Sequence, residues 1–237
     1  MGDGIYIGMA GAVARSQQLE SIADNLANAG SPGFKAARPA FESFLAPGSQ
    51  AGDRSYVAAV SSGIDLRPGP TQRTGNPLDL TPEDGNFLAT RQPDGNVGYT
   101  RDGRVQVSPQ GELRAAGGSL LDVNGKPIFV PPASAVSVTS VGQVMADNIE
   151  VGRIATFALE GKAERSGAGT VIPTAGTGTA RLTDSHLRVG ELELGNSSPL
   201  EAAVSMVSVQ RHYETSMQAI ETYKKMGDRS NELGRVR

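Results

Sequence analysis

The sequence contains no cysteine and no tryptophan among its 237 residues. Without thiols the chain can form no disulfide, no thiolate metal site and no cysteine nucleophile, so these classes of site are excluded. Aromatic residues are few, with 6 Phe and 5 Tyr against 30 Gly and 14 Pro. The length allows one large domain or two small ones, and the composition predicts that much of the middle consists of turns.

Strong charge of either sign is also lacking. The net charge is −3 and the basic residues are scattered, so no basic stripe for nucleic acid and no polybasic membrane anchor is expected. No window approaches the roughly 18 apolar residues of a membrane-spanning helix. The apolar N-terminal run has no positively charged region before it, so a secretory signal peptide is not predicted and any export is expected without cleavage.

The first thirty residues are patterned as a helix, predicted from Gly4 to Asn28. Small and apolar residues alternate at intervals of four and three: Ile5, Met9, Ala12, Ser16, Leu19, Ala23 and Leu26. This heptad spacing predicts a helix that lies along a second helix. Asp3 is expected as its N-cap, and Asn28, Gly30 and Pro32 as its stop signal.

The partner helix is expected at the other end of the chain. Ser198, Pro199 and Glu201 form a capping-box pattern with Pro at the first helical position. The same spacing then joins Ala202, Met206, Val209, Tyr213, Ser216, Ile220, Tyr223 and Gly227. Two amphipathic helices that pack separately on a central domain would show the same pattern.

The middle of the chain has the pattern of antiparallel β-structure. Glycines recur every 7 or 8 residues at Gly95, Gly103, Gly111, Gly118 and Gly125. Strands are predicted between and after these turns, and residues 166–179, rich in Gly, Ala and Thr, are expected to form a mobile loop. The predicted strands span 97–100, 105–108, 112–115, 119–123, 128–130, 136–139, 154–159 and 187–194.

These elements predict an α+β protein of more than one domain. Residues 1–30 and 197–237 would form a discontinuous helical coiled-coil domain, residues 31–75 an extended linker, and residues 76–196 an inserted all-β antiparallel domain. The two termini must then meet.

Residue types used in catalysis occur without a usable arrangement. Asp184, Ser185 and His186 are adjacent, and neighbouring side chains on a strand point to opposite faces. His212 is expected on the solvated flank of the last helix, and the segment from Gly118 to Lys126 lacks the spacing of a phosphate-binding loop. No catalytic, cofactor-binding or metal-binding residues are therefore predicted.

Several motifs resemble those of bacterial flagellar rod and hook proteins. They are Gly4-Ile5-Tyr6-Ile7-Gly8-Met9-Ala10-Gly11-Ala12, Asn25-Leu26-Ala27-Asn28-Ala29, Ser31-Pro32-Gly33-Phe34-Lys35, Pro77-Leu78-Asp79-Leu80 with Gly85-Asn86-Phe87, Gly98-Tyr99-Thr100-Arg101-Asp102-Gly103, and Gln210-Arg211-His212-Tyr213-Glu214. The opening motif and the short chain favour the proximal part of the rod, while the last motif also suits the distal part. A β-rich recognition module is the alternative outside this family.

The resemblance implies a structural, non-enzymatic subunit of the basal-body rod, the shaft between motor and hook. Its implied partners are copies of itself, other rod proteins and the flagellar type III export apparatus, and its implied location is the flagellar basal body. We call the two sets of heptad-spaced residues the seams of the two helices. Because the small residues on these seams allow helices to approach closely, we expect an assembly interface there. Its expected members are Ile5, Met9, Ala12, Leu19, Ala23, Leu26, Met206, Val209, Tyr213, Ile220 and Tyr223. Pro32 and Gly33 are expected to form the turn into the linker, with Gly33 at positive φ.

Overall fold

A computed structural model describes residues 2–45, 55–167, 169–184 and 186–235. The chain divides into two compact units. Unit 1 contains residues 1–27, 37–63 and 199–237, and unit 2 contains residues 28–36 and 64–198. Each unit is thus built from separate stretches of the chain, as expected for a protein whose two ends fold together.

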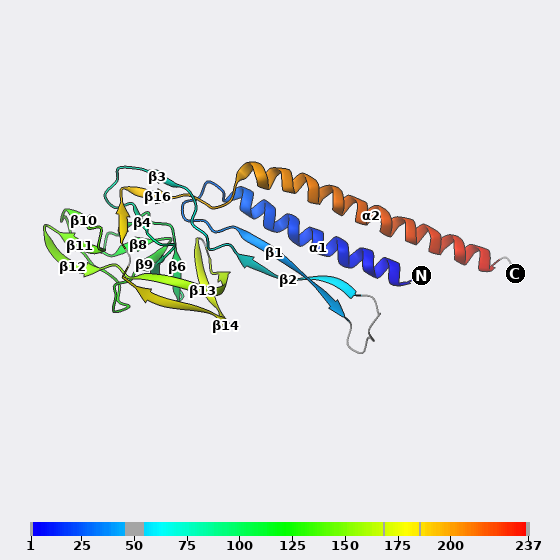
Figure 1. Cartoon of the computed structure of the whole chain (residues 1–237), viewed down its shortest axis with the longest axis horizontal. Coiled ribbons are helices and arrows are strands. Elements are labelled where there is room, and N and C mark those ends of the chain that lie inside the picture. Colours follow the sequence, from blue (N-terminus) through cyan, green and yellow to red (C-terminus); the bar gives the residue numbers. More distant parts are fainter. Residues whose placement is uncertain (1, 46–54, 168, 185, 236–237) are drawn as a thin grey trace. The chain divides into compact units, whose positions relative to one another are not determined.

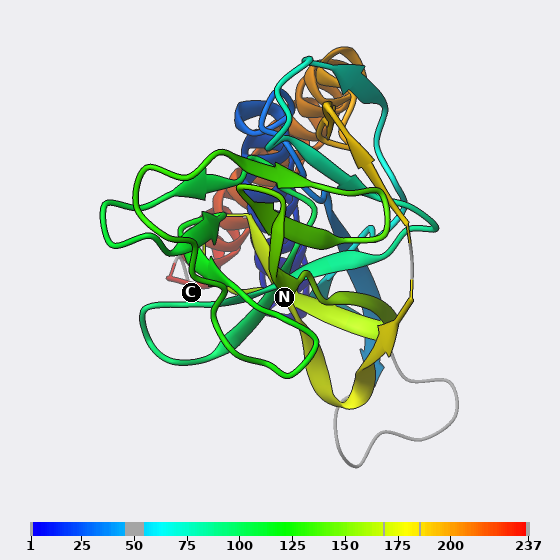
Figure 2. The same ribbon diagram turned by 90° about the vertical axis from the view of Figure 1, so that its left-hand side faces the viewer.

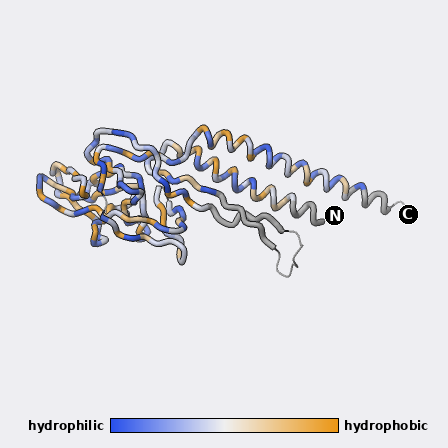
Figure 3. Tube along the Cα trace, in the orientation of Figure 1, coloured by the Kyte–Doolittle hydropathy of each residue, from blue (hydrophilic) through white to orange (hydrophobic). Residues whose placement is uncertain are grey.

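Unit 1 pairs the two ends of the chain. Helix α1 spans Gly2–Ala27 and helix α2 spans Pro199–Arg235, and Figure 1 shows them side by side and antiparallel. Apolar positions recur along both helices between hydrophilic ones (Figure 3). The helix ends agree with the prediction within a few residues, except that Asp3, expected as the N-cap, lies inside α1 because the helix begins at Gly2.

Unit 1 also contains strands β1 (Ala37–Leu45) and β2 (Ser55–Ile64), which pair in a two-stranded sheet. They lie in the range expected as an extended linker, so this range is more regular than its composition suggested. The backbone of Ala37 is held by Asn25 of α1, whose Oδ1 accepts from Ala37 N at 2.8 Å and whose Nδ2 donates to Ala37 O at 2.9 Å. The side-chain amide therefore bonds β1 as a neighbouring peptide group would.

Unit 2 is built from antiparallel strands. Its largest sheet has the order β13-β14-β6-β5-β9-β8-β7, and an additional pairing of β13 with β5 closes four strands into a ring. Figure 2 shows the strands of this unit around its interior. The seven strands are β5 (Phe87–Arg91), β6 (Val97–Thr100), β7 (Gln106–Val107), β8 (Leu113–Ala115), β9 (Gly118–Leu120), β13 (Thr156–Arg165) and β14 (Thr170–Thr183).

Smaller sheets complete unit 2. Strands β10 (Val136–Val138), β11 (Gln143–Ala146) and β12 (Ile149–Arg153) form a three-stranded sheet. Two further pairs join β15 (Leu187–Val189) to β4 (Leu80–Pro82) and β16 (Glu191–Glu193) to β3 (Thr71–Arg73). The inserted antiparallel β region expected from the sequence is therefore present.

The core of unit 2 is aliphatic, as the shortage of aromatics requires. Along β8 the burial alternates, with Leu113 and Ala115 buried and Arg114 exposed, which is the period-two pattern of a strand with one face inward. The central cluster consists of Leu80, Leu88, Val105, Leu113, Ala115, Leu120, Ile128, Val130, Val138, Val144, Ile154 and Leu187.

Three parts of unit 2 differ from the prediction. Residues 187–194 were expected as one strand, but they form β15 and β16, which pair with β4 and β3 and are separated by Gly190 at a φ of 78°. Residues 166–179 were expected as a mobile loop, but most of them lie in β14, which pairs with β13 and β6. Residues 128–130 were expected as a strand, yet only isolated bridges such as Glu112–Phe129 occur there. In these places pairing with other segments decides the conformation, and local composition does not report that pairing.

Candidate functional site: helix faces and a polar junction

The two helices of unit 1 meet along one row of side chains. Ile22, Ala202 and Val209 are buried, and Leu19, Leu26 and Met206 pack against them half-buried. Nearer the start of α1, a Cβ added to Gly8 would lie 2.8 Å from Ile220 Cγ1. Contacts between the two ends of the chain thus extend over several helical turns.

Most of the residues predicted to form the contact face of α2 are buried or half-buried. Val209 is buried, while Met206, Tyr213 and Ile220 are half-buried, and Tyr223 is 46% exposed. On α1, Ala12 is buried and Leu19 and Leu26 are half-buried, but Met9 and Ala23 are exposed. The side chain of Ile5 lies outside the described residues.

At two places the residue of α1 that contacts α2 is therefore the one before the predicted residue. Ile22 takes the place of Ala23, and Gly8 takes the place of Met9. The physical reason is a second neighbour of α1. On another face the helix contacts β1, where Ala14 is 4% exposed and Asn25 bonds Ala37. A heptad pattern records the average apolar direction of a helix and cannot separate two neighbours. A role of these residues in assembly remains a prediction.

A second apolar surface lies on α2 and is exposed. Leu200, Val204 and Val207 are 75%, 64% and 54% exposed. Their spacing of four and three residues places them in one stripe, and at about 100° per residue this stripe points roughly opposite to Ala202 and Val209. We call these three residues the outer stripe. Such a surface on a helix is typical of an interaction site.

The turn after α1 has the predicted form. Gly33 has a φ of 68°, and Phe34 N donates to Ser31 O at 3.2 Å, so Pro32 and Gly33 are the two central residues of a turn that needs positive φ at its second position. A Cβ on Gly33 would lie 2.1 Å from Asp102 N and 2.2 Å from the carbonyl carbon of Arg101. Within unit 2, the turn therefore packs directly on the backbone of Arg101 and Asp102.

Asn196, three residues before α2, fastens this turn to a second segment of unit 2. Its Oδ1 accepts from Ala36 N at 2.7 Å, and its Nδ2 donates to Asp65 O at 2.8 Å and to Arg67 O at 3.0 Å. Its own backbone N donates to Phe34 O at 3.2 Å. One side chain thus joins three stretches of unit 2.

Glu193 forms a buried ionic cluster beside Asn196. Its Oε1 accepts from Lys35 Nζ at 2.6 Å and from Gly69 N at 3.0 Å, and its Oε2 accepts from Arg101 Nε at 2.7 Å. Side-chain exposure is 3% for Lys35, 3% for Arg101 and 0% for Glu193. Both cations lie near the ring of Phe87, at 5.8 Å and 5.7 Å from its centroid.

Burial and the charges of this cluster shift the pKa values of Glu193 and Lys35. Burial alone would raise the pKa of Glu193, but the hydrogen bond and charge of Arg101 and the charge of Lys35 outweigh it and hold that pKa below its ordinary value. Burial lowers the pKa of Lys35, and the attraction of Glu193 offsets this only in part because Arg101 is also near. The carboxylate is thus ionised while it holds two buried cations.

We call residues 28–36, 65–69 and 193–196, together with Arg101, the polar junction. All of them belong to unit 2. The turn at Pro32 and Gly33 was predicted from the sequence, whereas the contacts of Glu193, Asn196 and Lys35 were not. The sequence carries no signal for the burial of Glu193, because the run Glu191-Leu192-Glu193-Leu194 alternates like a strand with one face in solvent.

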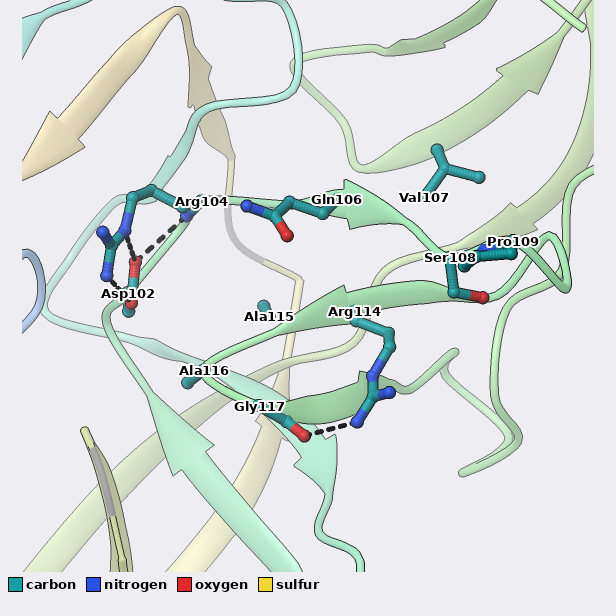
Figure 4. Close-up of a pocket in the computed structure, with 10 residues that line it drawn as sticks. All are labelled: Asp102, Arg104, Gln106, Val107, Ser108, Pro109, Arg114, Ala115, Ala116 and Gly117. Atoms are coloured by element: carbon teal, nitrogen blue, oxygen red, sulfur yellow. Dashed lines mark hydrogen bonds and ion pairs between the residues drawn. The ribbon is translucent and has the colours of Figure 1, made fainter. Parts of the chain in front are cut away.

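A surface pocket of about 590 Å³ lies on unit 2 beside β7 and β8 (Figure 4). Arg104 turns toward Asp102, with Nη2 at 2.7 Å from Oδ2, and Arg114 donates to Gly117 O at 2.7 Å. Both arginines are thus engaged within the protein. Figure 4 shows no convergence of a nucleophile and a base in this pocket.

The remaining polar candidates stay apart. His186 and His212 are exposed, Asp184 pairs with Arg153 at 2.7 Å, and Ser185 lies outside the described residues. Among the residues that the structure describes, no group of three or more His, Cys, Asp and Glu side chains could hold a metal ion. Neither described helix is long and apolar enough to cross a membrane.

Three family models match the chain in the order of its elements. Residues 5–35 match the flagella basal body rod protein, residues 84–146 the D1 domain of the flagellar hook protein FlgE/F/G, and residues 188–233 the C-terminal region of the flagellar basal body rod FlgEFG protein. The first and third regions include most of α1 and of α2, and both reach into the polar junction.

Relatives match over nearly the whole chain. The flagellar basal-body rod protein FlgF of Salmonella typhimurium is 32% identical over 248 residues, which cover 98% of each chain. FlgF of Escherichia coli shows the same identity and coverage. The flagellar basal-body rod protein FlgG of Borreliella burgdorferi is 29% identical over 98% of each chain.

The chain belongs to the flagellar basal-body rod protein family. Like the other members of this family, it is a structural subunit of the flagellar rod and not an enzyme. Its location is the flagellum, and its partners are other flagellar rod proteins.

Proposed function

We propose that the chain polymerises through its two terminal helices, with copies of itself and with neighbouring rod proteins. The observation that carries this proposal is the outer stripe. Its three large apolar side chains are each more than half exposed, while the opposite face of α2 is already occupied by α1. Burial of such a stripe gives roughly 1.5 kcal/mol or more per side chain, and a rod subunit meets other helices in its assembly.

The two helix faces therefore have different roles in this proposal. The contact row formed by Ile22, Val209 and their neighbours holds the ends of one chain together as a coiled-coil-like pair, and the outer stripe contacts another subunit. The positions predicted on the seams that are exposed here, Met9, Ala23 and Tyr223, are free to take part in the same assembly.

The test compares Val204→Asp with Ser208→Asp, which introduces the same charge at an exposed polar position of the same helix. Val204→Asp is expected to abolish rods in electron micrographs of isolated basal bodies and to abolish swimming, because a buried unpaired carboxylate between subunits is strongly unfavourable. Ser208→Asp is expected to retain both. Swimming cells with Val204→Asp would refute this use of the outer stripe.

We further propose a place in the proximal part of the rod and export by the flagellar type III apparatus without cleavage. FlgF relatives are 29 to 32% identical to the chain and FlgG relatives 25 to 29%, and this small difference supports the proximal position. Restoration of swimming in a strain lacking FlgF, and not in one lacking FlgG, is the expected result. The mass of the secreted chain should equal that of the chain in the cell, and a shorter secreted form would contradict export without cleavage.

A further inference from the structure

The strand β7 leaves one peptide group of its backbone without a partner. On one side β7 pairs with β8, and next to it Ser108 N donates to Glu112 O at 2.8 Å. Bonded and non-bonded pairs alternate along an antiparallel ladder, so Gln106 also bonds β8, while the N–H and C=O of Val107 point to the other side. The strand β7 is the last one of its sheet, so no further strand of the described residues lies there.

The chain covers this edge of the sheet only in part. Val105 N donates to Leu78 O at 3.2 Å, and two residues further along this antiparallel ladder Asn76 would lie opposite Val107. Asn76 instead folds back, and its O accepts from Asp79 N at 3.0 Å. Within the described part of the chain, Val107 N and Val107 O therefore have no partner on this edge. Unpaired groups of this kind are what an added strand bonds.

The pocket beside β7 and β8 adjoins the same edge. Arg104, Gln106 and Arg114 line it (Figure 4), and strand alternation together with the pairing of Gln106 to Arg114 places all three on one face. Arg104 bonds Asp102 through Nε and Nη2, and Arg114 bonds Gly117 O through Nη2. Each guanidinium thus retains N–H groups that bond no other described residue. With two arginines and one aspartate, the pocket is suited to a carboxylate.

An added strand would meet a different surface on each of its faces. A residue paired with Val107 has its side chain on the same face as Val107, whose own side chain is apolar and 41% exposed. The next residue of the added strand points to the face of Arg104 and Arg114. We propose that this edge of β7 binds an extended segment of a neighbouring rod subunit, in which an acidic residue stands beside an apolar one.

Photo-cross-linking in assembled rods tests this proposal. The photoreactive residue p-benzoylphenylalanine is placed at position 106 of the whole chain, cells are irradiated, and adducts in isolated basal bodies are identified by mass spectrometry. The expected adduct joins the chain to a rod-protein segment with Asp or Glu beside an apolar residue. In the unsubstituted chain, the amide of Val107 is expected to exchange rapidly in the monomer and slowly in basal bodies, because the added strand bonds it.

Arg114→Glu is then compared with Arg91→Glu. Arg91 is a matched control, since it is an exposed arginine of the same sheet that also donates through Nη2 to a backbone carbonyl, Gly125 O at 2.9 Å. Arg114→Glu is expected to lower the adduct yield roughly tenfold or more, because like charges across an interface oppose binding. Arg91→Glu should leave the yield unchanged. Changing the cross-linked acid of the partner to Lys should restore the adduct in the Arg114→Glu chain.

Absence of an adduct from position 106 in cells that form rods would overturn the proposal. So would an adduct to a segment without carboxylates, or a yield that Arg114→Glu does not change. The melting transition of unit 2 in the purified variants shows whether each one folds, and Arg114→Gln replaces Arg114→Glu if the latter does not. Both helices keep their sequence in every variant, so the outcome is independent of the proposed assembly through the outer stripe.

Discussion

Lys35 Nζ lies 2.6 Å from Glu193 Oε1 although the two residues are 158 positions apart in the sequence. Both side chains are almost completely buried. Loss of the carboxylate would leave two cations, Lys35 and Arg101, in a protein interior without a counter-charge. The cost of an unpaired buried charge is much larger than the net benefit of an ion pair, so this relationship determines several measurable properties of unit 2.

Glu193→Gln is expected to destabilise unit 2 by about 3 to 5 kcal/mol, the range for breaking a buried pair by removing one partner. Glu160→Gln is the matched control, because Glu160 and its partner Arg181 are 66% and 73% exposed and 3.9 Å apart. Such a surface pair contributes about 0 to 1 kcal/mol. Denaturant unfolding followed by circular dichroism measures both, and equal losses would show that burial of the cluster has no energetic consequence.

The stability of unit 2 is expected to depend on acid through the same carboxylate. The pKa of Glu193 is held below its ordinary value of 4.5, so the folded state binds this proton less tightly than the unfolded state. Its contribution is fully present above pH 4.5 and is lost as the pH falls through the lower folded-state pKa. Urea unfolding at pH 7 and pH 3 should therefore show a smaller difference between the wild type and Glu193→Gln at the lower pH. A difference independent of pH would contradict the prediction.

Gly33→Ala is expected to destabilise unit 2 more than its positive φ alone would cause. Strain at such a backbone position costs about 1 to 3 kcal/mol, and the added Cβ would also meet the backbone at Asp102 N, 2.1 Å away. Gly30→Ala is the control, since an added Cβ there has no heavy atom within 4 Å. Thermal unfolding measures both variants, and a normal melting temperature for Gly33→Ala would show that the turn can move away from the backbone of Arg101 and Asp102.

Regular local patterns explain what the sequence could predict. Strand β6 was expected at its observed bounds, Val97–Thr100, because turns at Gly95 and Gly103 enclose a short β-prone run. The helix α2 begins at Pro199 as expected, since Pro and a preceding Ser define a helix start locally. The positive φ of Gly33 was likewise predicted from the Ser-Pro-Gly turn sequence, and its observed φ of 68° confirms it.

Contacts between separate segments explain what the sequence could not predict. Strand β14 carries Gly176, Gly178 and several threonines, and its extended form depends on pairing with β13 and β6. Ile22 faces α2 in place of Ala23 because β1 contacts another side of α1. The polar junction has no periodic pattern, since its members come from four separate segments of the chain, at residues 28–36, 65–69, 101 and 193–196.

The contact row and the outer stripe can be separated by two substitutions on the same helix. Val209 is 5% exposed beside Ile22, and Val204 is 64% exposed. Val209→Asp is expected to disrupt pairing of α2 with α1 in the monomer, and Leu26→Asp is expected to do so from the other helix, because each places a carboxylate in an apolar contact. Val204→Asp should leave this pairing intact.

All three variants are expected to retain the melting transition of unit 2, whose core does not include these residues, and to fail in rod assembly. Far-ultraviolet circular dichroism and the cross-linking rate between Gly8→Cys and Ile220→Cys measure pairing in the monomer, and electron microscopy of basal bodies measures assembly. We expect Val209→Asp to lose pairing and Val204→Asp to retain it, while both fail to form rods. This result would assign the face of α2 with Val209 to contact with α1 of the same chain, and the outer stripe to contact with neighbouring subunits. Swimming cells with Val209→Asp or Leu26→Asp would show that rods tolerate unpaired ends, and loss of the unit 2 transition in these variants would make the helices part of its folding.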